Sequence, residues 1–223
     1  MSFVRIQNIS ISLDGFGTGE GLAFESPFGH AGERLHEWMF ATRFGRGMLG
    51  LPGGSDGVDN AFAERHETLG IGAEIMGRGK FSPQTGPWTD LGTDEEWRGW
   101  WGENPPFHTP VFVLTHHPRP SIEMEGGTVF HFVDASPQDA VAMAREAAGG
   151  RDVRIGGGPT MAREFIAAGL VDTIHLVQVP IVLGRGARLW DGLEGLETDY
   201  DVEQVASPSG VVHLTFTRRG DRG

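Results

Sequence analysis

The chain has 223 residues, of which 39% are hydrophobic, and it contains no cysteine. Its formal net charge is −12, which repels nucleic-acid phosphates and anionic membranes, and the missing cysteines exclude disulfides, thiolate metal sites and a cysteine nucleophile. This length suits one α/β domain, so we expect residues 1–223 to form a single domain. With no signal-peptide pattern and no apolar stretch long enough to cross a bilayer, we expect a cytoplasmic protein.

The N-terminal third mixes strand-like and helix-like patterns. Apolar and polar residues alternate over 3–13, which predicts a strand that ends at the Asp14-Gly15 turn. Three further elements and one loop are expected before residue 82: a short helix within 33–44, a long loop over 45–57, a helix from Asp59 to Thr68, and a short strand over 73–76 that runs into Gly77-Arg78-Gly79-Lys80.

The segment from Ser82 to Pro110 has no clear period, although it holds four of the six tryptophans. It predicts a long structured loop with about one helical turn over 94–101. Tryptophans in a loop of this length usually pack against something, either the chain's own sheet or a second copy of the chain.

The second half of the chain is more regular. Helical and extended patterns alternate, and the chain closes with an antiparallel hairpin. The expected elements are strands at 111–114, 128–133, 153–155 and 171–179, helices at 136–148 (with Ser136 as N-cap) and 159–168, and hairpin strands at 202–206 and 211–217. Together they predict an α/β fold with three layers: a mixed, mostly parallel sheet flanked by helices, with a C-terminal antiparallel hairpin.

The most informative stretch is the triple glycine Gly156-Gly157-Gly158, between a predicted strand and a predicted helix that opens with Pro159-Thr160. Free N–H groups at a helix N-terminus attract anions, and missing side chains let a diphosphate approach the backbone. A tight turn without a ligand is the alternative. The formal Gly-x-Gly-x-x-Gly match at 45–50 is not a dinucleotide motif, because a strand does not precede it and a helix does not follow it.

Two more strand ends carry cationic and hydrogen-bonding groups. Arg78 and Lys80 follow one strand, while Thr115, His116 and His117 follow another, with Arg119 close behind. Such groups recognise phosphates, and ligands collect at the carboxyl ends of parallel strands. Each segment alone could be a solvated loop, whereas three together indicate a phosphate-bearing ligand.

These motifs resemble the dihydrofolate-reductase-like superfamily. Within it, the chain is most similar to the C-terminal reductase domain of bifunctional riboflavin biosynthesis deaminase-reductases. The resemblance rests on an ordered set that covers nearly the whole chain: Ser12-Leu13-Asp14-Gly15-Phe16, Ile75-Met76-Gly77-Arg78, Val111 to Thr115, Ile155 to Gly158, and Gly169 to Asp172 followed by Pro180 to Gly184. The deaminase half's zinc site needs cysteines, which this chain lacks.

The resemblance implies a dihydrofolate-reductase-like fold and an NADPH cofactor that lies across the strand ends. The residues that it implies for cofactor binding are Ser10, Gly17, Gly77, Arg78, Lys80, Thr115, His116, His117, Gly156, Gly157, Gly158, Pro159 and Thr160. Lys80 stands where the family often has a hydroxyl residue, and Pro159 stands where dihydrofolate reductases often have arginine. We therefore expect the phosphate contacts to be shared with Lys80, His117 or Arg119.

For catalysis the resemblance points to two carboxylates, Asp14 in the turn motif and Glu37 on the first helix. Asp14 has the alternative role of bracing its glycine turn. Hydride transfer needs mainly orientation and electrostatics from the protein. A planar-ring pocket could be lined by aromatic residues and methionine, namely Trp38, Phe44, Met48, Trp97, Trp100 and Trp101.

The leading hypothesis is thus an NADPH-dependent reductase of a pyrimidine- or pterin-like small molecule, resembling 5-amino-6-(5-phosphoribosylamino)uracil reductase. The alternatives are a dihydrofolate or pterin reductase of another substrate, and a nucleotide-binding protein without turnover. A hydrolase or metal enzyme lacks its sequence signature, since there is no Gly-x-Ser-x-Gly elbow and no spaced set of metal ligands. We also expect a homodimer, because the family resemblance implies one and because the apolar stretch 171–183 and the tryptophans need cover.

Overall fold

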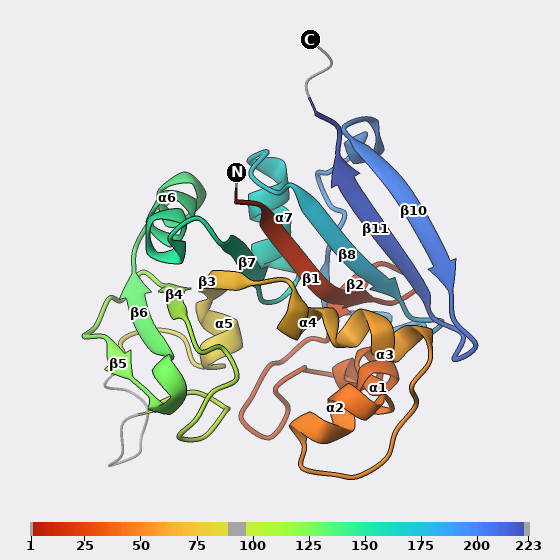
Figure 1. Ribbon diagram of the computed structural model, residues 1–223, viewed down its shortest axis with the longest axis horizontal. Coiled ribbons are helices and arrows are strands. Elements are labelled where there is room, and N and C mark those ends of the chain that lie inside the picture. The colour runs from red at the N-terminus through yellow and green to blue at the C-terminus, as the bar shows by residue number, and fades with distance from the viewer. Residues whose placement is uncertain (1, 89–96, 221–223) are drawn as a thin grey trace.

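The computed structural model describes residues 2–88 and 97–220 and centres on a nine-stranded sheet (Figure 1). The strand order is β10-β11-β8-β1-β7-β3-β4-β6-β5. Their bounds are β1 Val4–Ile11, β3 Ile71–Gly77, β4 Pro110–Leu114, β5 Ile122–Glu123, β6 Val129–Val133, β7 Asp152–Gly156, β8 Thr173–Gln178, β10 Tyr200–Ala206 and β11 Val212–Arg218. The five central pairings from β8 to β6 are parallel, whereas β10, β11 and β5 pair antiparallel at the edges. The sheet is therefore mixed and mostly parallel, and β10–β11 is the predicted hairpin.

Short helices and one small ribbon complete the described chain. A separate two-stranded ribbon joins β2 (Phe16–Thr18) to β9 (Ala187–Arg188). The α-helices are α1 Glu37–Phe40, α2 Arg43–Met48, α3 Val58–Ala63, α4 Arg65–Thr68, α5 Arg78–Phe81, α6 Pro137–Ala148 and α7 Pro159–Ala167, and 3-10 turns occupy Gly32–Leu35, Glu125–Gly127 and Leu196–Thr198. In Figure 1 the orange helices α1–α3 lie below the blue strands, and the green helix α6 lies at the opposite side of the sheet.

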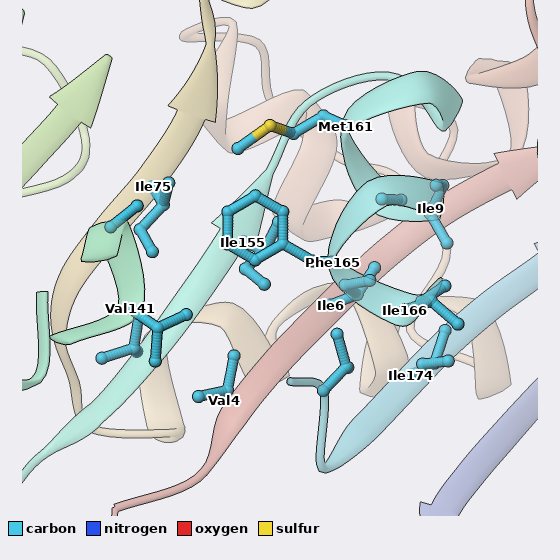
Figure 2. Close-up of a cluster of buried hydrophobic side chains, with 14 of the residues drawn as sticks. Val4, Ile6, Ile9, Ile75, Val141, Ile155, Met161, Phe165, Ile166 and Ile174 are labelled. Atoms are coloured by element: carbon cyan, nitrogen blue, oxygen red, sulfur yellow. The ribbon is translucent and has the colours of Figure 1, made fainter. Parts of the chain in front are cut away.

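Alternation along the strands gives the sheet two buried faces. On β3, Ile75 packs with residues of α6 and α7. Its neighbour Met76 belongs to the cluster of Phe81, against which Trp88 and Trp97 pack. On β8, Leu176 joins the first cluster and Val177 joins Trp38 of α1. Figure 2 shows the first cluster, in which Phe165 and Ile166 of α7 meet Val4, Ile6 and Ile155 of the sheet. Helices therefore cover both faces, and the predicted three-layer, dihydrofolate-reductase-like fold is confirmed.

Two helix starts follow from the residues predicted to form them. The Ser136 hydroxyl accepts the Asp139 N–H at 3.2 Å and caps α6, which ends at Gly149 in the left-handed region (φ 58°). Pro159 opens α7 directly after the glycines.

The largest differences from the predicted elements lie between residues 33 and 81. The expected helix in 33–44 is broken into several short turns. The Thr42 hydroxyl accepts the Gly45 N–H and caps α2, which begins at Arg43 and continues into the expected loop as far as Met48. Arg78, Gly79 and Lys80 belong to the short helix α5, for which Gly77 is the N-cap. The short strands β2, β5 and β9 were not predicted, and the helical turn expected over 94–101 lies partly outside the described residues.

The two surfaces on which the homodimer prediction rested are largely covered within the chain, although Val182 at the end of the apolar stretch is 64% exposed. Strand β8 lies between β1 and β11, and Ile174, Leu176 and Val177 are buried. Trp88, Trp97 and Trp101 pack against the cluster that contains Phe130 and Phe132. The homodimer stays a prediction. None of the helices in the described ranges is long and apolar enough to cross a membrane.

Candidate functional site

A cavity of about 970 Å³ opens at the carboxyl ends of the central strands. It borders the ends of β7, β3 and β4 and the middle of β1. Its other wall comes from the α1–α2 region, where Met39, Phe40, Phe44 and Met48 supply apolar surface. A cavity of this size accepts a ligand larger than most drug-sized molecules. It therefore has a strand-end side rich in polar groups and a side suited to a flat ring.

The triple glycine forms the turn from β7 into α7. Gly157 has φ of 140°, which disfavours any side chain, and Gly158 is the N-cap, with no side chain to satisfy the first N–H groups of the helix. All three glycines, with Pro159 and Thr160, line the cavity. The N-terminus of the nine-residue α7 thus offers the N–H groups of Thr160 and Met161, which Gly158 has no side chain to cap, and a positive dipole end to an anion.

Arg78 adds a cation beside this turn, at the start of α5. Its guanidinium stacks on Trp88 with 3.8 Å to the ring centroid, and burial lowers its pKa from the ordinary value. Its Nε and Nη2 atoms are buried and find no hydrogen-bond partner among the described residues, although the residue lines the cavity. A cation left without an acceptor at a cavity wall is suited to a phosphate.

Behind the turn lies a second set of charges, formed by Lys80, Arg154 and Glu74. Arg154 of β7 pairs with Glu74 of the neighbouring β3, and a Cβ built on Gly156 would lie 2.5 Å from Lys80 Nζ. Burial lowers the pKa of Lys80 to about 8 and that of Arg154 to about 9. With both cations and the carboxylate charged, the set carries one net positive charge against the glycine turn, which again favours an anion there.

The segment after β4 closes the cavity on its far side. The Thr115 hydroxyl accepts the His117 N–H at 3.1 Å, and the His117 carbonyl accepts from the Trp88 indole. The His116 side chain is 92% exposed and lies 3.1 Å from Asp134. Thr115, His116 and His117 all line the cavity, whereas Arg119 is packed between Trp88 and Phe132 and is not among its lining residues.

Ser10 and Gly17 border the cavity from β1 and β2. The Ser10 hydroxyl is buried and accepts from Trp38 Nε1 at 2.9 Å, so it is held in place by α1. A Cβ on Gly17 would come within 3.1 Å of the Pro159 ring. The structure thus brings all thirteen residues predicted to bind a cofactor to the wall of one cavity. That they bind one stays a prediction.

The two predicted catalytic carboxylates lie elsewhere. Asp14 accepts hydrogen bonds from the Ser12 hydroxyl (2.5 Å) and from the N–H groups of Leu183 (3.0 Å) and Gly184 (2.7 Å). The bond from Ser12, followed by that from Leu183, lowers the pKa of Asp14 to about 2. Asp14 therefore braces its turn, which was its alternative role, and it is not among the lining residues. Glu37 is exposed at the start of α1 and does not line the cavity either.

The ring-pocket residues are divided in the same way. Phe44, Met48, Trp100 and Trp101 line the cavity, but Trp38 and Trp97 do not. Trp38 is buried and Trp97 donates to the Phe81 carbonyl at 2.8 Å, so both support the wall from behind.

Sequence reasoning missed Asn8 and His36 at this site. His36 lines the cavity, and burial lowers its pKa to about 4, so it is neutral at physiological pH. Asn8 lines it from a bulge in β1. The available signal was in the strand pattern, because apolar residues at 4, 6, 9 and 11 slip by one position between Ile6 and Ile9. The described residues contain no group of acidic and histidine side chains able to hold a metal ion.

Three solved structures have this fold and share 15–19% of their sequence with the chain. A riboflavin biosynthesis protein from Shewanella sp. PV-4 has a TM-score of 0.56 at 19% identity, with 99% of this chain and 100% of that chain covered. A pyrimidine reductase-like protein from Corynebacterium diphtheriae has a TM-score of 0.51 at 16% identity, with 99% and 93% covered. A diaminohydroxyphosphoribosylaminopyrimidine deaminase/5-amino-6-(5-phosphoribosylamino)uracil reductase from Thermotoga maritima has a TM-score of 0.50 at 15% identity, with 98% of this chain and 57% of that chain covered.

No curated protein matches the chain. The model of the RibD C-terminal domain family does match, over residues 75–214, which include the carboxyl end of β3, the strand ends after β4 and β7, and the glycine turn. This match spans more than half of the chain and contains most of the cavity's polar wall. The chain therefore belongs to the RibD C-terminal domain family, a family of oxidoreductases.

Proposed function

We propose that the protein is an NADPH-dependent reductase that transfers a hydride to a pyrimidine- or pterin-like small molecule, in the manner of 5-amino-6-(5-phosphoribosylamino)uracil reductase. The observation that carries the proposal is the Arg78 guanidinium, buried at the cavity wall with Nε and Nη2 unpaired among the described residues. It lies beside a glycine turn whose N–H groups are uncapped. A nicotinamide dinucleotide phosphate supplies several anionic oxygens to such a wall, as well as the hydride when it is bound.

Different residues along the cavity wall would bind different parts of the cofactor. Gly156, Gly157 and Gly158 let a diphosphate reach the N-terminus of α7, and Arg78 and Lys80 balance its charge. Thr115 and the two following histidines would border the adenosine and its 2′-phosphate.

At the other end, Ser10 and Gly17 would lie near the carboxamide of the nicotinamide. The apolar side chains of α1 and α2 would exclude water from the ring that accepts the hydride.

Two measurements test the proposal. Calorimetry should show tighter binding of NADPH than of NADH, since the additional phosphate meets the Thr115–His117 segment. Stopped-flow absorbance of the reduced nicotinamide against a panel of pyrimidines, pterins and quinones should then show oxidation with at least one pyrimidine or pterin. Equal affinity for the two cofactors contradicts the choice of NADPH, and no binding of either contradicts the dinucleotide site.

A nucleotide-binding protein without turnover is the second candidate. It is favoured by one observation, that neither Asp14 nor Glu37 reaches the cavity. The same two assays separate the candidates, because tight NADPH binding without oxidation by any compound of the panel supports the second and contradicts the first.

A further inference from the structure

Strand β1 contains a bulge that faces the cavity. Ile6 pairs with Ile174 and Ile9 with Leu176, so Gln7 and Asn8 together oppose the single residue His175 of β8. Asn8 has φ of 57°, a left-handed conformation that asparagine adopts more readily than most residues. Gln7 and Asn8 both line the cavity. A bulge with a left-handed residue beside a site often serves to aim a side chain.

A buried chain of hydrogen bonds supports this bulge from behind. His175 Nδ1 lies 3.3 Å from the Asn8 backbone nitrogen and 2.8 Å from Asn8 Oδ1. His175 Nε2 lies 3.1 Å from His213 Nδ1, and His213 Nε2 lies 2.9 Å from Asp59 Oδ1. Asp59, His213 and His175 are all buried, and the Phe62 ring stacks on both imidazoles. We call these three residues the relay.

The charges of the relay determine which way each hydrogen bond runs. Burial, then the neighbouring His213, lowers the pKa of His175 to about 3, and burial also lowers the pKa of His213. Burial works to raise the pKa of Asp59, but hydrogen bonds from His213 and from the Ser207 and Ser209 side chains outweigh it. At neutral pH a carboxylate thus faces two neutral imidazoles.

These charge states fix the donor and the acceptor of each hydrogen bond from Asp59 to Asn8. The carboxylate accepts from His213 Nε2–H, His213 Nδ1 accepts from His175 Nε2–H, and His175 Nδ1 is left as an acceptor. It accepts the Asn8 backbone N–H, which the bulge has removed from the sheet ladder. Two acceptors repel each other at 2.8 Å, so the Asn8 carboxamide exchanges its oxygen and nitrogen and turns NH₂ toward Nδ1. The Gln7 carboxamide, whose Nε2 lies 3.3 Å from the same Asn8 atom, then exchanges as well and turns its oxygen toward that NH₂ group. In this orientation the carboxamide oxygen is directed away from His175, and Asn8 lines the cavity.

The position of Asn8 places it on the substrate side of the cavity. It is tied to β8 and to α3, on the opposite side of β1 from the glycine turn of β7. Helix α3 in turn contacts α1 and α2, which carry the apolar lining. A ring resting on that lining needs a polar partner, and Glu37 points to solvent.

We propose that Asn8 determines substrate specificity: its carboxamide oxygen, held by the Asp59–His213–His175 relay, accepts a hydrogen bond from a ring N–H of a planar nitrogen heterocycle. This proposal rests on the proposed function, since the heterocycle is the hydride acceptor of that reaction. The three relay members are positioning residues, and Asn8 is the one that touches the ligand.

The first experiment needs no ligand. Long-range ¹H–¹⁵N correlation spectra of the ¹⁵N-labelled protein at neutral pH report which imidazole nitrogens carry protons. The expected result for His175 is an unprotonated Nδ1 and a protonated Nε2. A protonated Nδ1 overturns the proposal, because His175 would then donate to the carboxamide oxygen and leave NH₂ facing the ligand.

The second experiment compares two probes on two proteins by calorimetry. The probes are a diaminouracil and its analogue with methylated ring nitrogens, and the proteins are the wild type and Asn8→Gly, which tolerates the left-handed backbone. Methylation should weaken binding to the wild type by about 3- to 10-fold, as for one lost hydrogen bond, and should have no effect in Asn8→Gly. An equal penalty in both proteins, or no binding of the diaminouracil to the wild type, overturns the proposal.

Controls separate this proposal from the proposed function and from misfolding. NADPH affinity should be the same in Asn8→Gly and in the wild type. A wild-type protein that does not bind NADPH contradicts the dinucleotide site, and this result is independent of Asn8. His175→Phe retains a ring on Phe62 and should reproduce the Asn8→Gly result, while His131→Phe on the distant strand β6 should behave as wild type. Normal discrimination by a folded His175→Phe contradicts the positioning role, and Asn8→Gly decides the ligand contact if His175→Phe does not fold.

Discussion

Arg78→Gln should uncouple cofactor affinity from the stability of the protein. The substitution removes a buried guanidinium whose Nε and Nη2 have no hydrogen-bond partner in the described part of the chain. A hydrogen bond between charged groups contributes about 1.5–3 kcal/mol, and about 1.4 kcal/mol corresponds to a factor of ten in affinity. We therefore expect NADPH to bind about 10- to 150-fold more weakly to the variant.

The free energy of unfolding without ligand should respond in a different way. Loss of the stacking on Trp88 (3.8 Å) destabilises the protein by about 0.5–2 kcal/mol, whereas removal of an unpaired buried cation offsets part of this. Urea denaturation followed by tryptophan fluorescence should thus show a change within about 1 kcal/mol.

Arg119→Gln is the matched control, because Arg119 contacts the same Trp88 ring but lies outside the cavity lining and donates to the Trp97 carbonyl at 2.7 Å. It should lower stability more than Arg78→Gln and leave NADPH affinity within about threefold of wild type, since Arg119 does not line the cavity and makes no direct contact with a ligand there. Calorimetry with both variants decides the matter. NADPH affinity of Arg78→Gln within twofold of wild type would refute the assignment of Arg78 to a phosphate.

Three further outcomes are expected. Gly157→Val should remain folded by circular dichroism and lose NADPH binding in calorimetry, because a side chain at this position is incompatible with φ of 140° and would occupy the space of the diphosphate. Normal NADPH binding by the variant would show that the glycines form only a structural turn. The pKa of Asp14 is lowered from 3.8 to about 2, so the stability that the ionised carboxylate contributes is present above pH 4 and is lost as pH falls toward 2. In Asp14→Asn the Tm should therefore fall less steeply than in the wild type between about pH 4 and pH 2, and an equal fall of Tm in the two proteins contradicts this prediction. Light scattering should give twice 24.1 kDa for the homodimer, with the exposed Val202 and Val205 of the edge strand β10 as the candidate contact, and a mass near 24.1 kDa contradicts it.

The regular parts of the fold could be predicted from local pattern. Strands β4, β6 and β7, helices α6 and α7 and the C-terminal hairpin have clear periods and clear caps, such as Ser136. Between residues 33 and 81 the helices are four to six residues long, too short for a helical period to show. Their positions depend on tertiary contacts and local caps, such as that of Thr42.

The candidate site shows the same division. The glycines, Arg78 and the Thr115–His117 segment follow strands, so the topology of a parallel sheet brings them together. Asp14 was expected in catalysis because its motif is shared, yet two of its three hydrogen bonds, those from Leu183 and Gly184, form only when the segment after β8 folds back onto the turn. Asn8 was missed because its role depends on residues far away in sequence, at 59, 175 and 213.

The placement of β1 has a consequence for how the protein acquires its shape. This N-terminal strand lies in the middle of the sheet, and its parallel partners come late, since Val4 pairs with Val153, 149 residues further along. Closing so long a loop costs conformational entropy before the contacts between the strands can stabilise the sheet. In a chain emerging from the ribosome, the apolar residues of β1 therefore have no sheet partner until β7 and β8 have been synthesised. The cavity wall needs β1 and β7 together. Ligand binding thus becomes possible only at the end of synthesis, and recovery of binding after dilution from denaturant is a measure of completed folding.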